Sequence, residues 1–76
     1  DLRGKRFDEA EAMIDTFMDK ATRSGWNVVY ILHGHGSGAL KRAVREDWLR
    51  LCSYVHSFAP ANEDQGGDAY TVAALR

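Results

Sequence analysis

The stretch NVVYILHGHGSGAL, residues 27–40, decides how this chain folds. Residues 27–32 form a nearly continuous run of β-branched, aromatic and aliphatic side chains, which is typical of a strand covered on both faces. Three glycines at alternate positions then break the pattern, and Ser37 is a candidate N-cap for a following helix. We therefore expect a central strand, a glycine loop and a helix in direct succession.

The segment before this stretch predicts a short strand and an amphipathic helix. Residues 2–4 are typical of the end of a strand. From Asp8 onward apolar residues recur at helical spacing, and Asp8 with Glu11 matches a capping box. We expect this helix to end at Ser24 and Gly25, because glycine is common just beyond a helix C-terminus.

The segment after the glycine loop predicts a second helix and two further strands. Residues 55–58 and 69–75 have the composition of strands, and the short link between them favours antiparallel pairing. Asp47 falls within the apolar arc of the helix, where it has no evident partner. That arc consists of Leu40, Ala43, Val44, Trp48 and Leu51.

These elements predict a single α/β domain over residues 1–76. The order is β-α-β-α-β-β, and right-handed crossovers place both helices on one face of the sheet. We therefore expect a two-layer sandwich with a four-stranded mixed sheet. Because the chain opens with residues that already look like part of an element, we expect it to be one domain of a longer protein.

The composition excludes some classes of partner and leaves others open. No apolar run approaches the roughly 20 residues that a membrane helix needs, so no membrane is expected as a partner. The net charge of −1 does not indicate a nucleic-acid binder, but a nearly neutral total is compatible with a local basic face. The basic residues form two clusters, Arg3, Lys5 and Arg6, and Lys41, Arg42 and Arg45.

Cys52 is the single cysteine, so the chain has no internal disulfide and no zinc site of the usual ligand spacing. This is compatible with a reducing, intracellular compartment. A metal site built on the two loop histidines lacks a third ligand nearby in the sequence, and no resident metal is expected.

The strand–glycine loop–helix arrangement is suited to holding a phosphate group. Glycines let the backbone approach an anion closely, and the free N–H groups at a helix start point toward it. The loop is not a Walker A motif, since no Gly-Lys-Ser/Thr follows at the required spacing. It is not a dinucleotide-binding motif either, since Ala39 occupies the position of the last glycine. The candidate phosphate-binding residues are Gly34, Gly36, Ser37 and Gly38.

His33 and His35 are the candidate catalytic residues of this loop. Histidine titrates near neutral pH, so it can take or give a proton during phosphodiester cleavage. If the first strand lies beside the central strand, Asp1 and Arg3 reach the same edge of the sheet. There Arg3 is suited to clamp a phosphate, and Asp1 to orient a histidine or position a metal. The alternatives are a structural histidine and a surface ion pair.

Three segments together resemble the signatures of the Smr (small MutS-related) domain family. They are residues 1–4 (DLRG), 33–40 (HGHGSGAL) and 67–72 (GDAYTV), and their order and spacing agree over essentially the whole chain. Many members have a histidine where Arg3 stands and a lysine where His35 stands. The arginine form is most similar to the branch fused to the C-terminus of MutS-type ATPases. The resemblance implies the β-α-β-α-β-β sandwich, similar to the C-terminal domain of bacterial translation initiation factor three.

The resemblance also implies a nucleic-acid endonuclease that nicks DNA or cleaves RNA, with links to DNA repair and recombination and a MutS-like ATPase as its covalently linked parent. RNA cleavage through the neighbouring 2′-hydroxyl needs no cofactor, whereas DNA cleavage would favour a divalent metal, Mg or Mn, near Asp1. The catalytic candidates are then Asp1, Arg3, His33 and His35. The candidate nucleic-acid-binding residues are Lys5, Arg6, Lys41, Arg42 and Arg45.

Two further hypotheses stay open. A non-catalytic nucleic-acid- or ribosome-binding module needs only the basic clusters. A protein-interaction appendage of a larger ATPase would instead dock through the acidic face of the first helix, which includes Asp15 and Asp19.

Overall fold

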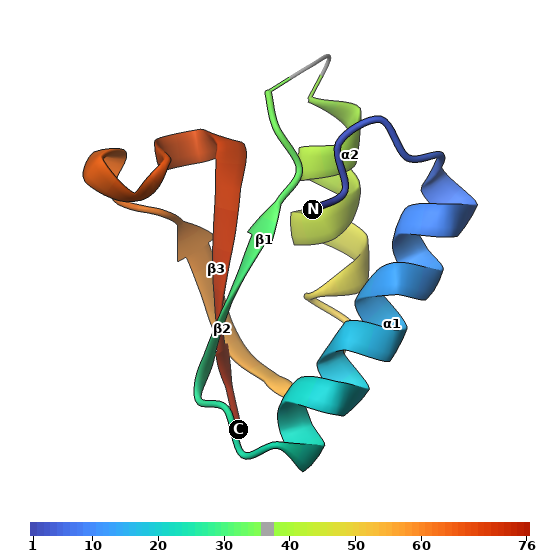
Figure 1. Cartoon of the computed structure of the whole chain (residues 1–76), viewed down its shortest axis with the longest axis vertical. Coiled ribbons are helices and arrows are strands. Elements are labelled where there is room, and N and C mark those ends of the chain that lie inside the picture. The colour runs from blue at the N-terminus through green and yellow to red at the C-terminus, as the bar shows by residue number, and fades with distance from the viewer. Residues whose placement is uncertain (36–37) are drawn as a thin grey trace.

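The computed structural model describes residues 1–35 and 38–76 of the chain. Its elements are helix α1, strand β1, helix α2, which continues as a π-helical segment, and strands β2 and β3 (Figure 1). Two single turns of 3₁₀-helix lie between β2 and β3. The bounds are Phe7–Arg23 for α1, Val28–Leu32 for β1, Ala39–Arg42 for α2, Ala43–Trp48 for the π-helical segment, Val55–Pro60 for β2, Glu63–Gln65 and Gly67–Ala69 for the 3₁₀ turns, and Tyr70–Leu75 for β3.

The sheet has three strands among the described residues, in the order β1-β3-β2. β3 runs antiparallel to both neighbours, with Val72 opposite Tyr30 of β1 and Ala73 opposite Phe58 of β2. The expected antiparallel pairing of the last two strands is therefore confirmed. The expected four-stranded mixed sheet with β1 at its centre is corrected to three antiparallel strands with β3 at the centre.

Residues 2–4 do not form the predicted first strand. Leu2 donates one backbone hydrogen bond to the Leu32 carbonyl, at 2.7 Å. The chain then turns, with Gly4 at a φ of 76° and the Lys5 N–H bonded back to the Leu2 carbonyl. One backbone hydrogen bond followed by a turn brings this segment against the end of β1 but does not make a strand of the sheet. The Leu2 side chain is nevertheless buried in the hydrophobic core.

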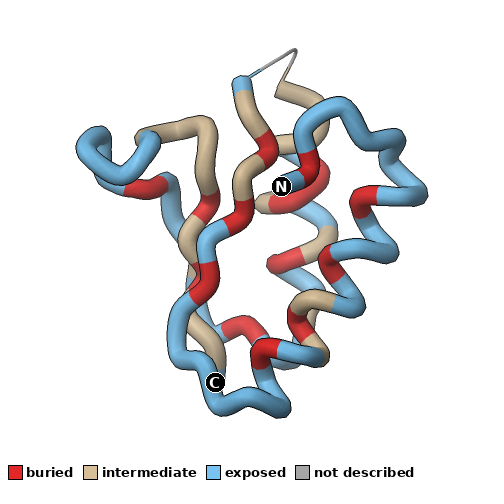
Figure 2. The backbone as a smooth tube through the Cα atoms, viewed as in Figure 1, coloured by how far each residue is buried: buried red, intermediate tan, exposed pale blue. Residues whose placement is uncertain are grey.

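Both helices cover the same face of the sheet, as expected, and the molecule has two layers (Figure 1). The residues of the hydrophobic core lie between these layers, including Ile14 and Met18 of α1 and Val29 and Ile31 of β1 (Figure 2). Along β1 these alternate with the exposed Val28 and Tyr30. The prediction that β1 is covered on both faces is wrong, because Val28 and Tyr30 on its second face are 48% and 45% exposed.

Helix α1 begins earlier than its sequence pattern indicated. Arg6 is the N-cap, and its backbone N–H donates to Glu9 Oε1 at 3.1 Å, so the capping box lies two residues before the expected Asp8 and Glu11 pair. The predicted end is confirmed. The Ser24 N–H donates to the Lys20 carbonyl at 2.9 Å, and Gly25 follows with a φ of 76°. No helix in the described part of the chain has the length and apolar character needed to cross a membrane.

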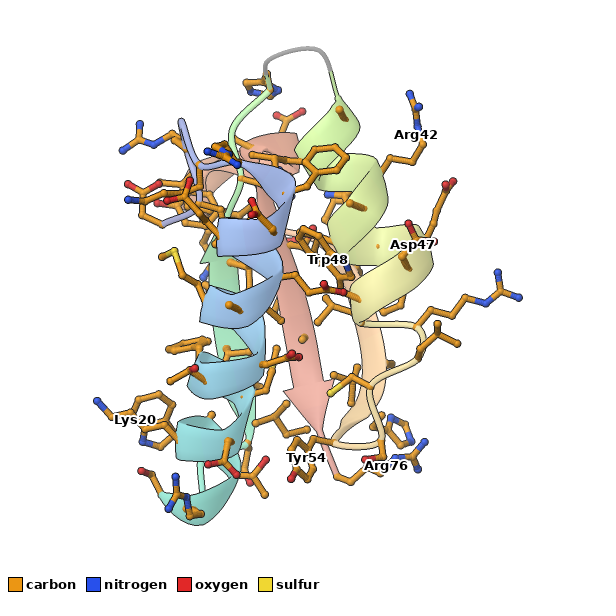
Figure 3. The ribbon with its side chains drawn as sticks, turned by 90° about the vertical axis from the view of Figure 1, so that its right-hand side faces the viewer. Lys20, Arg42, Asp47, Trp48, Tyr54 and Arg76 are labelled. Atoms are coloured by element: carbon orange, nitrogen blue, oxygen red, sulfur yellow. The ribbon has the colours of Figure 1, made fainter. Side chains whose placement is uncertain are left out.

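The π-helical turn after α2 changes which residues face the core. The Leu49 N–H donates to the Val44 carbonyl, five residues back, at 2.9 Å. The wider turn shifts the register of the later residues. Leu49 is therefore buried at 1% exposure, whereas Leu51, which the helical pattern placed in the core, is 81% exposed. The same shift leaves Asp47 in solvent, and Trp48 packs edge-on against Phe7 between the two helices (Figure 3).

Two leucine substitutions test this register. We expect Leu49→Ala to lower the free energy of unfolding by about 2–5 kcal/mol, since it leaves a cavity in the core. Leu51→Ala is the matched control and should change it by less than about 0.5 kcal/mol. Urea denaturation measures both values. A larger loss in Leu51→Ala than in Leu49→Ala would show that the helix keeps regular α-helical register to its end.

Candidate functional site: the pocket beside the glycine loop

A surface pocket of about 470 Å³ lies where the N-terminal segment, the end of β1 and the start of α2 meet. The N-terminal segment passes close to these two elements in Figure 1. The structure thus brings together two of the sequence segments that were singled out, although they are 30 residues apart. The lining residues are Arg3, Gly4, Lys5, Phe7, His33, Gly34, His35, Gly38, Ala39 and Leu40.

Arg3 and Asp1 form an exposed ion pair at this pocket. Arg3 Nη2 lies 2.9 Å from Asp1 Oδ2, and Arg3 Nε lies 3.1 Å from Asp1 Oδ1. The Arg3 backbone N–H also donates to Asp1 Oδ1 at 3.0 Å. These bonds point both carboxylate oxygens of Asp1 at the guanidinium, so the carboxylate that was expected to orient a histidine is bonded to Arg3.

Gly34 is needed for the position of Arg3. Its φ of 77° lies in the left-handed region that favours glycine. A Cβ atom at this position would lie 3.2 Å from Cγ of Arg3. The aliphatic part of the arginine therefore rests directly on the loop backbone, and any side chain at Gly34 would press against it.

His33 is buried, with 5% of its surface exposed, and both ring nitrogens have hydrogen-bond partners. Nδ1 lies 2.8 Å from the Gly34 carbonyl oxygen, and Nε2 lies 2.8 Å from Thr71 Oγ1. A carbonyl oxygen only accepts, so Nδ1 carries the proton. Burial lowers the pKa of His33, against the effect of the bond to Gly34, and Arg45 lowers it further. The imidazole is therefore neutral near pH 7.

The backbone at the end of β1 is tied to the start of β3. The N–H groups of His33 and Gly34 both donate to the Ala69 carbonyl oxygen, at 3.1 and 3.0 Å. These two bonds, together with the hydrogen bond between the His33 ring and the Gly34 carbonyl, hold the first residues of the loop in place. His35 follows directly, is exposed and lines the pocket.

Arg45 and Lys41, two predicted nucleic-acid-binding residues, are paired within the domain. Arg45 Nη1 lies 2.9 Å from Asp68 Oδ1, and Arg45 Nε donates to Thr71 Oγ1 at 2.8 Å. Arg45 Nη2 also donates to the carbonyl of Tyr70 at 3.1 Å, which leaves the arginine side chain 18% exposed. Lys41 Nζ pairs with the other carboxylate oxygen of Asp68. The hydrogen bonds from Lys41 and then Arg45 lower the pKa of Asp68 to about 2.

Sequence reasoning did not single out Thr71 and Asp68 as members of the site. Both fall in the segment 67–72, whose order and spacing were noted without a role for these side chains. Their partners are 23 to 38 residues away, so no local pattern indicated the contacts.

The other predicted cations are exposed. Lys5 lines the pocket, and Arg6 lies 3.7 Å from Asp8. Arg42 extends from α2 into solvent (Figure 3). A second hollow, which shares Gly38 with the pocket, lies beside Arg42 and is also lined by Lys41, Arg45 and Glu46. Gly36 and Ser37, predicted to bind phosphate, lie outside the described residues.

The described residues do not fit a divalent metal. No group of three or more histidine, cysteine, aspartate or glutamate side chains among them is arranged to hold an ion. Both oxygens of Asp1, the carboxylate expected to position a metal, are engaged by Arg3.

The lowered pKa of Asp68 predicts a stability change in acid. The folded state favours the carboxylate, so this contribution is present above the ordinary pKa of 3.8 and is lost as the pH falls towards about 2. We expect the free energy of unfolding to decrease over this interval and the decrease to be smaller in Asp68→Asn. Denaturation at a series of pH values measures this. Asp64→Asn, at an exposed residue of the same connection, is the control and should behave as wild type.

Comparisons with known proteins agree over the full chain. The family model described as the Smr domain matches residues 1–76. A protein of Fusobacterium nucleatum named "Endonuclease MutS2" is 40% identical over 76 residues, and one of the same name from Anaeromyxobacter sp. is 43% identical over 76 residues. Each match covers 100% of this chain but 10% and 9% of the relative, so the chain spans about a tenth of their length.

A solved structure has the same fold. The structure titled "Crystal structure of the Smr domain of Thermus thermophilus MutS2" matches with a TM-score of 0.94 and 43% sequence identity. The match covers 99% of this chain and 92% of that one.

Proposed function

This chain belongs to the Smr domain family, and from that premise we propose that it is a nucleic-acid endonuclease module whose site is the pocket beside the glycine loop. One observation carries the proposal. Arg3 and Lys5 of the N-terminal segment and His35 of the glycine loop line one open pocket, together with Gly34 and Gly38. A fixed cation, a second cation and an exposed imidazole are the groups that phosphodiester cleavage uses.

Arg3 binds the phosphate to be cleaved. Its guanidinium is exposed, and its planar donor geometry matches two phosphate oxygens. Asp1 holds the guanidinium in a fixed orientation until the substrate binds. Some of the Arg3 N–H groups that donate to Asp1 then donate to the phosphate instead. Arg3 then stabilises the extra negative charge of the pentavalent transition state. Gly38, with a positive φ and open space where a Cβ would stand, leaves room for the phosphate beside the backbone, while Gly34 supports the side chain of Arg3.

The two histidines have different roles in this proposal. His35 is exposed in the pocket and is the group that takes or gives the proton. His33, the other catalytic candidate, uses both ring nitrogens for contacts within the domain and keeps the loop in place. On RNA, His35 accepts the proton of the 2′-hydroxyl as its oxygen attacks phosphorus. The bond to the 5′-oxygen breaks, His35 gives the proton it has taken up to this leaving oxygen, and the products carry a cyclic phosphate and a 5′-hydroxyl. On DNA, water is the nucleophile.

The nucleic-acid backbone continues from the pocket across Gly38 to the second hollow. Lys5 and Arg6 contact it on one side, and Arg42 contacts it on the other. Lys41 and Arg45 add positive potential there, while their direct contacts stay with Asp68. Binding should therefore weaken as salt rises, because each phosphate contact releases condensed cations. By the names of the matched relatives, the longer parent protein is of the MutS2 type.

The decisive experiment compares cleavage by two histidine variants. Labelled single-stranded RNA, supercoiled plasmid and branched DNA are incubated with the protein in EDTA, magnesium or manganese, and the product ends are mapped. We expect His35→Asn to lower the cleavage rate by about 100-fold or more, as for loss of a general acid or base. His56→Asn, at an exposed histidine on β2, is the control and should cleave as wild type.

The three possible outcomes separate the hypotheses. EDTA-resistant RNA cleavage that leaves a cyclic phosphate and depends on His35 supports a metal-free ribonuclease. Nicking of DNA that depends on His35 supports the DNA reaction. Retained, salt-sensitive binding with no cleavage of any substrate would contradict the nuclease proposal and support the non-catalytic binding module.

A further inference from the structure

A chain of three hydrogen bonds links the π-helical segment to the glycine loop through the interior. Arg45 Nε donates to Thr71 Oγ1, Thr71 Oγ1 is paired with His33 Nε2, and His33 Nδ1 is paired with the Gly34 carbonyl oxygen. Each of the three distances is 2.8 Å. Thr71 is completely buried, so water does not compete for its hydroxyl.

The two ends of this chain and the neutral imidazole between them determine where the protons lie. A guanidinium N–H only donates and a carbonyl oxygen only accepts, so Thr71 Oγ1 accepts from Arg45 and His33 donates from Nδ1 to Gly34. Because burial keeps the imidazole neutral, its Nε2 carries no proton, and Thr71 Oγ1 donates its own proton to Nε2. All three bonds then run in one direction, from the π-helical segment towards the loop.

We propose that Thr71 and Arg45 are positioning residues of the site, which hold His33 as the neutral Nδ1–H tautomer and thereby hold the Gly34 peptide under Arg3. The consequence for cleavage rests on the proposed function, whereas the tautomer and the position of Gly34 do not. Neither residue touches the substrate in this role. The sequence analysis placed Arg45 among the nucleic-acid-binding cations, but its guanidinium bonds groups within the domain.

The other tautomer is disfavoured at both ends of the imidazole. A proton on Nε2 would make Thr71 Oγ1 accept from both Arg45 and His33, and the threonine proton would have no acceptor in a buried position. At the other end, a bare Nδ1 would face the Gly34 carbonyl oxygen, so two lone pairs would meet at 2.8 Å. An unpaired buried polar group is costly, so this tautomer would require the Gly34 peptide to turn.

Arg45 is itself held firmly enough to act as the anchor. Its Nη1 pairs with Asp68 and its Nη2 donates to the Tyr70 carbonyl, so three guanidinium nitrogens have partners on or beside β3. Asp68 is in turn shared with Lys41. The π-helical segment that carries Arg45, the turn that carries Asp68 and the start of β3 thus form one support for the loop.

The test measures the imidazole directly and cleavage separately. Nitrogen-15 NMR of labelled histidine, without substrate, reports the tautomer of His33 and whether Nε2 accepts a hydrogen bond. In wild type we expect Nδ1–H and a hydrogen-bonded Nε2. Thr71→Ser keeps the hydroxyl and should keep both signatures. Thr71→Val should move the Nε2 resonance towards that of a free lone pair, and Arg45→Met should bring in the Nε2–H tautomer and shift the Gly34 amide.

We expect the variants whose His33 and Gly34 resonances shift to cleave more slowly than wild type. We expect kcat to fall about 10- to 100-fold in Thr71→Val and Arg45→Met, as for a displaced reactive group, with KM nearly unchanged because Arg3 and Lys5 remain. Thr71→Ser should stay within about twofold of wild type. An unchanged Nδ1–H tautomer of His33 together with a wild-type Gly34 amide resonance in both Thr71→Val and Arg45→Met would overturn the proposal. If these resonances shift as expected but the wild type cleaves nothing, the positioning role stands and the proposed function falls.

Discussion

The site depends on two hydrogen bonds of the buried His33 imidazole, because they join the glycine loop to the central strand of the sheet. One ring nitrogen holds the Gly34 carbonyl and the other meets Thr71 of β3. A small domain buries little apolar surface, so a loop with several glycines needs polar anchors to keep one conformation. The bonds from His33 and Gly34 to the Ala69 carbonyl supply the backbone part of this anchor. Arg3 can then rest on Gly34, and His35 is placed in the pocket.

Polar contacts within the domain also determine how charge is distributed around the site. Asp1 binds one cation and Asp68 binds two, and the two carboxylates play different parts in the structure. Asp1 orients an exposed arginine at the pocket, whereas Asp68 binds Lys41 and Arg45 and directs Arg45 towards Thr71. The net charge of −1 therefore conceals a division between cations that face solvent, such as Lys5 and Arg42, and cations that support the fold.

Local patterns in the sequence predicted the two helices, the last three strands and the common face on which the helices pack. They failed where the outcome depends on distant parts of the chain. Strand order is a non-local property, so residues 27–32 indicated a central strand although β3 takes that place. A regular 3.6-residue period could not reveal the wider turn that buries Leu49 in place of Leu51. In the site, the loop glycines and histidines were visible as a motif, and the structure brings Arg3 to them. The chain of three hydrogen bonds that starts at Arg45 and passes through Thr71 could not be predicted, because a hydrogen bond between residues 26 positions apart leaves no periodic pattern in the sequence.

The central claim is that a phosphodiester backbone binds at the loop that His33 holds in place. The most direct test is an NMR titration of the labelled protein with a phosphorothioate oligonucleotide that resists cleavage. This account predicts that the largest shifts occur at Arg3, Gly34 and His35, and that they weaken as salt is raised. Shifts centred instead on Val28 and Tyr30, on the open face of the sheet, would contradict it.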